Sequence, residues 1–159
     1  MVVRRNFITQ ALFASGETVK YAIIYWSRFG NNRKIAEHLA KALERKGTVE
    51  ILTADRADPG AMPAADVYVF SAAAEKFSIQ SDMKKLMKVL RNMDGRRYAL
   101  INTHALGFKS WLGRMNKLLS KSGMSKIAEL DFRMGEGTDK GNGLPEGWEK
   151  RLDEFAAKL

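Results

Sequence analysis

The sequence predicts an α/β fold built on a doubly wound, five-stranded parallel sheet. Its 159 residues suit one α/β domain with a sizeable core. Five short apolar runs, rich in β-branched and aromatic residues, have the length and composition of buried strands. Four segments with helical spacing of apolar residues lie between or after these runs. Strands and helices that alternate in this way are typical of successive βαβ units.

The composition of the predicted strands also indicates how they pair. They are Tyr21–Trp26, Val49–Thr53, Asp66–Ser71, Arg97–Asn102 and Ile127–Phe132. The centres of the first and third are continuously apolar, at Ala22–Ile24 and Val67–Phe70. Continuous apolar runs are typical of strands that helices cover on both faces, and this favours a parallel sheet.

Apolar stripes with helical spacing predict four helices. The stripes are Ile35, Ala36, Leu39, Ala40 and Leu43; Met83, Leu86, Met87 and Leu90; Leu112, Met115 and Leu119; and Trp148, Leu152, Phe155 and Leu159. Core packing is enough to explain them, so the methionines indicate no cofactor. Ser81 is the candidate N-cap of the second helix, and Pro145 precedes the first turn of the fourth. The segment 55–65, with two prolines and a glycine, is expected to be a loop or one short turn.

Composition excludes several kinds of site within these residues. The chain has no cysteine, so it has no disulfide, thiolate metal site or cysteine nucleophile. His38 and His104 are the two histidines and lie far apart in sequence, which argues against a histidine-rich metal site. No stretch approaches the roughly 18 consecutive apolar residues of a transmembrane helix. Residues 135–147 are expected to form a polar, glycine-rich loop.

The net charge of +9 is concentrated in one segment. From Lys84 to Lys126 there are eleven basic residues and a single acid, Asp94. A positive field of this density favours an acidic protein partner, an anionic membrane surface or nucleic acid. The alternative is a solvated basic face that only keeps the protein soluble. Nucleic acid is the least favoured partner, because the segment has no reader motif and no interleaved exposed aromatics.

We assign residues 1–19 to an N-terminal arm and residues 20–159 to one domain. Residues 4–8 read Arg-Arg-Asn-Phe-Ile and resemble a twin-arginine export signal. The apolar run that follows is short and interrupted by Thr9 and Gln10, with no clear cleavage motif after it. We therefore expect an arm packed on a cytoplasmic domain, with export through this signal as the alternative.

The turn after the first predicted strand carries the most informative functional pattern. A buried run ends at Trp26, a polar turn with a glycine spans Ser27 to Asn32, and a helix with basic residues follows. This order directs backbone N–H groups and the positive end of a helix at one place. It therefore predicts the binding site of a phosphate-bearing cofactor.

From about Tyr21 to its end, the chain resembles the flavodoxin family. The phosphate loop of that family usually reads Ser/Thr-x-Thr-Gly-x-Thr, and the same place here reads Ser27-Arg28-Phe29-Gly30-Asn31-Asn32. Ser27 and Gly30 match, whereas Phe29 and Asn32 replace hydroxyl residues. The resemblance implies a flavodoxin-like fold with strand order 2-1-3-4-5 and FMN bound where the order reverses.

The resemblance also assigns all six residues of this loop to cofactor binding. The two substitutions leave the backbone N–H groups intact, and these supply much of such a phosphate cradle. The side-chain amide of Asn32 is expected to donate to the phosphate, and Arg28 is expected to add positive charge.

A second cofactor loop is expected after the third strand. It begins with Ser71, Ala72 and Ala73, whose small side chains allow a flat ring to approach the backbone. Phe77 is the aromatic residue of this loop that can stack on a flavin. The proline that the family often has here is missing, so the match is partial.

A third loop is expected after the fourth strand, where the resemblance assigns cofactor contacts to Thr103, His104, Gly107 and Phe108. Thr103 and Gly107 stand where the family contacts the flavin or closes the pocket, and Phe108 can cover a ring. Trp111 can also cover a ring, although we favour its place in the following helix and in the core. We expect His104 to be a surface loop residue rather than a proton donor.

These features favour an FMN-binding electron-transfer protein whose partner is an acidic redox protein or an anionic membrane surface. Flavodoxins are typically acidic, so the basic segment reverses the usual charge of the carrier. Two alternatives remain open. One is a flavin-dependent oxidoreductase acting on a quinone or a tetrapyrrole precursor, and the other is a flavodoxin-fold binding module that has lost FMN.

Overall fold

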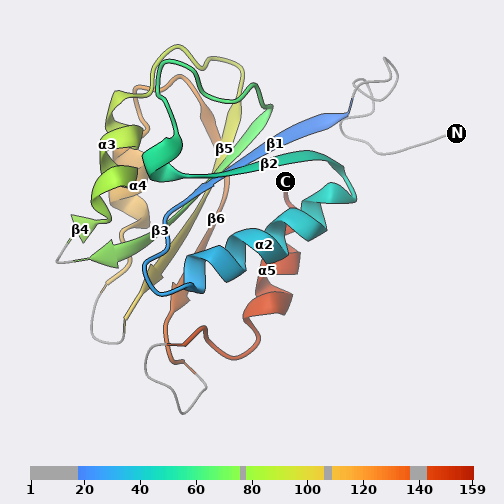
Figure 1. Ribbon diagram of the computed structural model, residues 1–159, viewed down its shortest axis with the longest axis vertical. Coiled ribbons are helices and arrows are strands. Elements are labelled where there is room, and N and C mark those ends of the chain that lie inside the picture. Colours follow the sequence, from blue (N-terminus) through green and yellow to red (C-terminus); the bar gives the residue numbers. More distant parts are fainter. Residues whose placement is uncertain (1–17, 76–77, 106–108, 137–142) are drawn as a thin grey trace, which may run out of the picture.

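The computed structural model describes residues 18–75, 78–105, 109–136 and 143–159, and it has the predicted α/β architecture (Figure 1). Five parallel strands form the sheet: β1 (Val19–Tyr25), β2 (Gly47–Thr53), β3 (Val67–Glu75), β5 (Arg97–His104) and β6 (Ser125–Arg133). Their order is β2-β1-β3-β5-β6, which confirms the predicted 2-1-3-4-5 order of the five principal strands. A short sixth strand, β4 (Ser78–Ile79), pairs antiparallel with the end of β3 and was not predicted.

Helices cover both faces of the sheet, as the continuous apolar strands required. On one face lie α2 (Asn31–Glu44) and α5 (Trp148–Ala156), and on the other lie α3 (Ser81–Val89) and α4 (Leu112–Leu118) (Figure 1). The segment after β2 contains one short 3-10 turn, η1 (Ala54–Arg56), in agreement with the expected loop. Among the described residues, no helix combines the length and apolar character that crossing a membrane requires.

Each face of the sheet contributes to its own apolar core because side chains alternate along a strand. In β1, Tyr21 and Ile23 pack toward α2 and α5, whereas Ala22 and Ile24 pack toward α3 and α4. Nearly all members of the predicted apolar stripes are buried, and the exceptions, Leu112 and Trp148, are half-buried against the same cores. The two cores hold the strands rigidly, so the carboxyl ends of β1, β3 and β5 are fixed relative to one another.

Each of the five parallel strands differs from its predicted bounds at one end or both, and the differences in β3 and β5 bear on the site. β3 continues to Glu75 and β5 to His104, so the residues expected to begin the second and third loops lie on strands. The N-cap of α3 is Gln80 rather than Ser81: the Gln80 side-chain oxygen accepts from the backbone N–H of Met83 at 3.0 Å. The longer amide side chain reaches this N–H from one position earlier, which leaves Ser81 inside the helix.

Tyr21 gives the protein a pH-dependent contribution to stability. Its hydroxyl donates to the main-chain oxygen of Leu159 at 3.3 Å, which ties β1 to the end of the chain. Burial raises the pKa of Tyr21 from 10.0 to about 12, with Arg97 opposing this shift and Asp66 adding to it. The neutral phenol is therefore favoured in the folded state, and its contribution is fully present below pH 10.

We expect the free energy of unfolding to fall as the pH rises from about 10 toward about 12, because the unfolded chain releases this proton first. Tyr21→Phe removes this part of the pH dependence. Urea unfolding of both proteins across this window is the measurement. Parallel pH profiles for the two proteins would show that Tyr21 is not the source of the effect.

Candidate functional site

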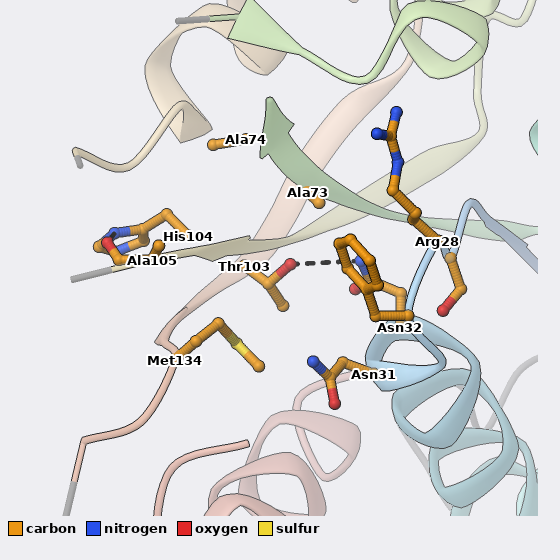
Figure 2. A pocket seen from close by; sticks show the side chains of 11 residues that line it. Arg28, Asn31, Asn32, Ala73, Ala74, Thr103, His104, Ala105 and Met134 are labelled. Carbon is orange, nitrogen blue, oxygen red and sulfur yellow. Dashed lines mark hydrogen bonds between the residues drawn. The ribbon is translucent and has the colours of Figure 1, made fainter. Parts of the chain in front are cut away.

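A cleft of about 180 Å³ lies at the carboxyl ends of β1, β3 and β5 (Figure 2). It is lined by Ser27, Arg28, Phe29, Asn31, Asn32, Ala73, Ala74, Thr103, His104, Ala105 and Met134. The turn after β1 supplies one wall, and the ends of β3 and β5 supply the opposite wall. This is the position at which ligands bind in open α/β sheets.

The wall formed by the turn after β1 ends in the N-terminus of α2. Gly30 is the N-cap residue, with a left-handed φ of 91° that a side chain would strain. No side chain caps the helix, and its first turn contains no acid. The backbone N–H groups of Asn32 and Arg33 have no acceptor within the helix. The helix end therefore presents donors and partial positive charge to the cleft, which suits an anion.

Ser27 adds a second feature that points to an anion. Among the described residues, its Oγ is one of the buried side-chain polar atoms that have no hydrogen-bond partner. A buried hydroxyl without a hydrogen-bond partner lowers the stability of a fold by about 1–3 kcal/mol, so nearly all such groups in native proteins are paired. Since Ser27 lines the cleft beside the α2 N-terminus, a phosphate oxygen is a suitable acceptor for its proton.

The Asn32 side chain is turned toward the sheet and has partners there that were not predicted, and its donation to a phosphate stays a prediction. The residue is 3% exposed. Its Nδ2 donates to Thr103 Oγ1 at 3.2 Å (Figure 2), and its Oδ1 accepts from Ser71 Oγ at 2.9 Å. The side chain thus ties α2 to both β3 and β5. Asn32 positions the loop, and its backbone N–H and the second hydrogen of Nδ2 remain for a ligand.

Phe29 also departs from the role of the hydroxyl residue it replaces. Its side chain is 85% exposed and lines the cleft, so an apolar ring stands at the mouth. Ala73, Ala74, Ala105 and Met134 supply small or flexible apolar side chains to the rest of the cleft. The cleft therefore combines an anion-binding end with an apolar remainder.

His104 is a buried strand residue, not the surface loop residue that we expected. It is 7% exposed and ends β5, where its Nε2 lies 2.7 Å from Asp131 Oδ2 on the neighbouring strand β6. Its Nδ1 lies 3.3 Å from the carbonyl oxygen of Ala105. Both ring nitrogens therefore face protein acceptors, and the ring lines the cleft in a fixed orientation without offering a nitrogen to a ligand.

The structure brings most of the predicted site residues together. Eight of them line the cleft: Ser27, Arg28, Phe29, Asn31, Asn32, Ala73, Thr103 and His104. Gly30 shapes the turn as the N-cap, Ser71 lies behind Asn32, and Ala72 is buried in the core beneath α3 and α4. The predicted contacts of Phe77, Gly107 and Phe108 lie outside the described residues.

Four residues at the site were not predicted from the sequence. Ala74, Ala105 and Met134 line the cleft, and Asp131 holds His104. No signal in the sequence singles out Asp131, because the last strand also contains Glu129, Lys126 and Arg133. The prediction for Trp111 is confirmed, because it starts α4 and packs against the core, with its backbone N–H donating to Asn102 Oδ1 at 3.1 Å.

Comparison with known proteins places the chain in a family. The model of the Flavodoxin family matches residues 23–150. No curated protein sequence matches the chain. Among solved structures, a flavodoxin from Streptococcus pneumoniae TIGR4 is similar, with a TM-score of 0.71, 17% identity, and coverage of 88% of this chain and 97% of that one.

Two further structures show the same fold. Flavodoxin 2 from Bacillus cereus has a TM-score of 0.70 and 15% identity, and the alignment covers 87% of this chain and 96% of that one. Rubredoxin oxygen:oxidoreductase from Desulfovibrio gigas has a TM-score of 0.66 and 14% identity, with 93% of this chain aligned to 37% of that larger protein. The family match covers most of the sequence, and these folds agree with it, so the chain belongs to the flavodoxin family.

Proposed function

We propose that this protein binds FMN in the cleft and acts as an electron-transfer protein of the flavodoxin type. The observation that carries the proposal is the unpaired, buried Ser27 hydroxyl beside the uncapped N-terminus of α2. Family membership supports the same cofactor. A dianionic phosphate would satisfy the hydroxyl and the free amides at once.

The remaining residues of the cleft fit the rest of FMN. Ala73, Ala74 and Ala105 leave room for a flat ring near the backbone, and Phe29 and Met134 can cover apolar surface and exclude water. When bound, the flavin would supply the redox chemistry, while the chain holds its phosphate and controls access of solvent. Arg28 lines the cleft and adds positive charge next to the phosphate end.

The arrangement of His104 favours a carrier over a flavin-dependent oxidoreductase. Reduction of a quinone consumes protons, and a side chain that delivers one must face the substrate. Both nitrogens of His104 are engaged by Asp131 and Ala105, and the other histidine, His38, contacts Asp153 at 2.8 Å between α2 and α5. Rapid turnover of the loaded protein with a quinone as sole acceptor would contradict the carrier assignment.

Titration of the apo-protein with FMN and with riboflavin tests cofactor binding. We expect FMN to quench its fluorescence on binding and to bind at least about tenfold more tightly than riboflavin, which lacks the phosphate that the Ser27 end of the cleft recognises. Equal affinities for the two flavins would remove the phosphate site from the proposal. Failure to bind either flavin, with binding of inorganic phosphate retained, would favour the binding-module alternative.

A further inference from the structure

The charge concentrated in one segment of the sequence becomes one surface of the fold. Helices α3 and α4 lie side by side on the same face of the sheet (Figure 1). Six exposed cations lie on these helices or directly after them, and we call this surface the basic face: Lys85, Lys88, Arg91, Arg114, Lys117 and Lys121. Two helices held by a common core present these charges at fixed positions rather than on a flexible tail.

Cations outnumber acids on and around the basic face. Among the described residues 78–105 and 109–121, the acids are Asp82 and Asp94. Asp82 accepts from Gln80 Nε2 at 3.2 Å, and Asp94 lies near Gly123, at the same end of α4 as Lys121. The turn η1, which packs against α3, adds one exposed acid, Asp55, beside Arg56. Within the described chain, none of the six cations forms an ion pair.

The opposite surface of the sheet is built differently. There Arg33 Nε pairs with Glu37 Oε2 at 3.2 Å, and His38 bridges to Asp153 between the two helices. Cations and acids are interspersed along α2 and α5. The cations of the basic face therefore repel one another, whereas ion pairs reduce such repulsion on the α2–α5 surface. An anionic partner bound to the basic face would reduce the repulsion there.

We propose that the basic face docks an acidic surface of a partner protein. The helices α3 and α4 begin at the carboxyl edge of the sheet, where the cleft opens, and run away from it, so Lys85 and Arg114 lie nearer the cleft than Arg91 and Lys121 do. Lys109 extends the charge toward that edge, with its Nζ 5.0 Å from the centre of the Trp111 ring. Complementary charge at this place steers an encounter and orients it.

Two other anionic surfaces fit the face less well. Binding in the interface of a bilayer scales with the apolar area that can insert, and Val89 is the single large apolar side chain exposed on the described part of the face. Single-stranded nucleic acid is held by aromatic side chains that stack on bases, and Trp111 is half-buried against the core. An acidic protein surface needs only the charges that are present.

A charge-matched pair of variants tests the proposal in the full chain, with or without FMN. The face variant carries Lys85→Gln, Lys88→Gln and Lys117→Gln, and the control carries Lys41→Gln, Lys150→Gln and Lys158→Gln on the α2–α5 side. All six lysines are exposed, and each variant loses three charges. The probes are a polyglutamate peptide, vesicles of phosphatidylcholine and phosphatidylserine in equal parts, and oligothymidylate. Urea unfolding checks that both variants keep the stability of the parent protein.

We expect the polyglutamate peptide to bind the parent protein more tightly than the vesicles or the oligonucleotide do. Its affinity should fall about tenfold in the face variant, because three exposed charge pairs with the peptide are lost, and less than about threefold in the control. Backbone amide shifts on peptide addition should map to α3 and α4.

Equal losses of peptide affinity in both variants would mean that the peptide senses only the total charge. Preferential binding of vesicles or oligothymidylate would mean that the partner is a membrane or a nucleic acid. Each of these results overturns the proposal. None of these readouts needs flavin, so failure of FMN binding leaves the test intact.

Discussion

Ser27→Asp is expected to weaken FMN binding by at least about 100-fold, which is the largest effect of a single substitution on the site. The change replaces the hydroxyl donor with a carboxylate facing a phosphate dianion. A lost hydrogen bond to a charged group costs about 1.5–3 kcal/mol, and like-charge repulsion in the cleft adds to it. The measurement is the fluorescence titration of apo-protein with FMN.

Riboflavin is the matched control ligand for this variant, because it lacks the phosphate. Its affinity should stay within about threefold of that for the parent protein. The fold should also survive, since an acid beside the N-terminus of α2 interacts favourably with the helix dipole and can accept from its free amides. If FMN and riboflavin lose affinity to the same extent, the phosphate does not lie at Ser27. Ser27→Ala should show an intermediate loss for FMN alone.

The fold was largely predictable because local composition and tertiary burial agree along most of the chain. Apolar runs covered on both faces indicated a parallel sheet, and the stripes on α2 and α3 indicated the faces that pack on it. The strand ends were not predictable in the same way. Thr103 and His104 have polar side chains, which a single sequence associates with loops, and they are buried in β5 because Asn32 and Asp131 satisfy them.

The candidate site was likewise predictable where its pattern is local and unpredictable where it depends on distant contacts. The turn from Ser27 to Gly30 was predicted from sequence because a strand, a glycine-containing turn and a helix follow one another locally. The direction of the Asn32 side chain depends on Ser71 and Thr103, which lie 39 and 71 residues away in sequence. The orientation of His104 depends on Asp131 across a strand pair. Such contacts arise from the register of the sheet, which no local pattern contains.

Asn32 therefore has a structural role whose loss should be large. Asn32→Ala removes both hydrogen bonds of the buried amide and leaves the hydroxyls of Ser71 and Thr103 without their partner. Each unpaired buried group costs about 1–3 kcal/mol, so we expect the free energy of unfolding to fall by about 2–5 kcal/mol. Urea unfolding at neutral pH is the measurement. Lys34→Ala, an exposed change two residues further along α2, is the control and should alter stability by less than about 0.5 kcal/mol.

A triple variant shows whether the stability lost in Asn32→Ala comes from the unpaired hydroxyls or from the loss of packing. Adding Ser71→Ala and Thr103→Val to Asn32→Ala removes the two hydroxyls that the single change leaves unpaired. Replacing every partner of a hydrogen bond by an apolar group costs much less than removing one partner and leaving the other buried. The triple variant should therefore be more stable than Asn32→Ala alone, although it carries more substitutions. If it is less stable by the sum of the single effects, the three side chains act independently and Asn32 does not hold α2 to β3 and β5. FMN affinity should follow the stability of this contact, because the same residue fixes the helix end whose amides face the phosphate.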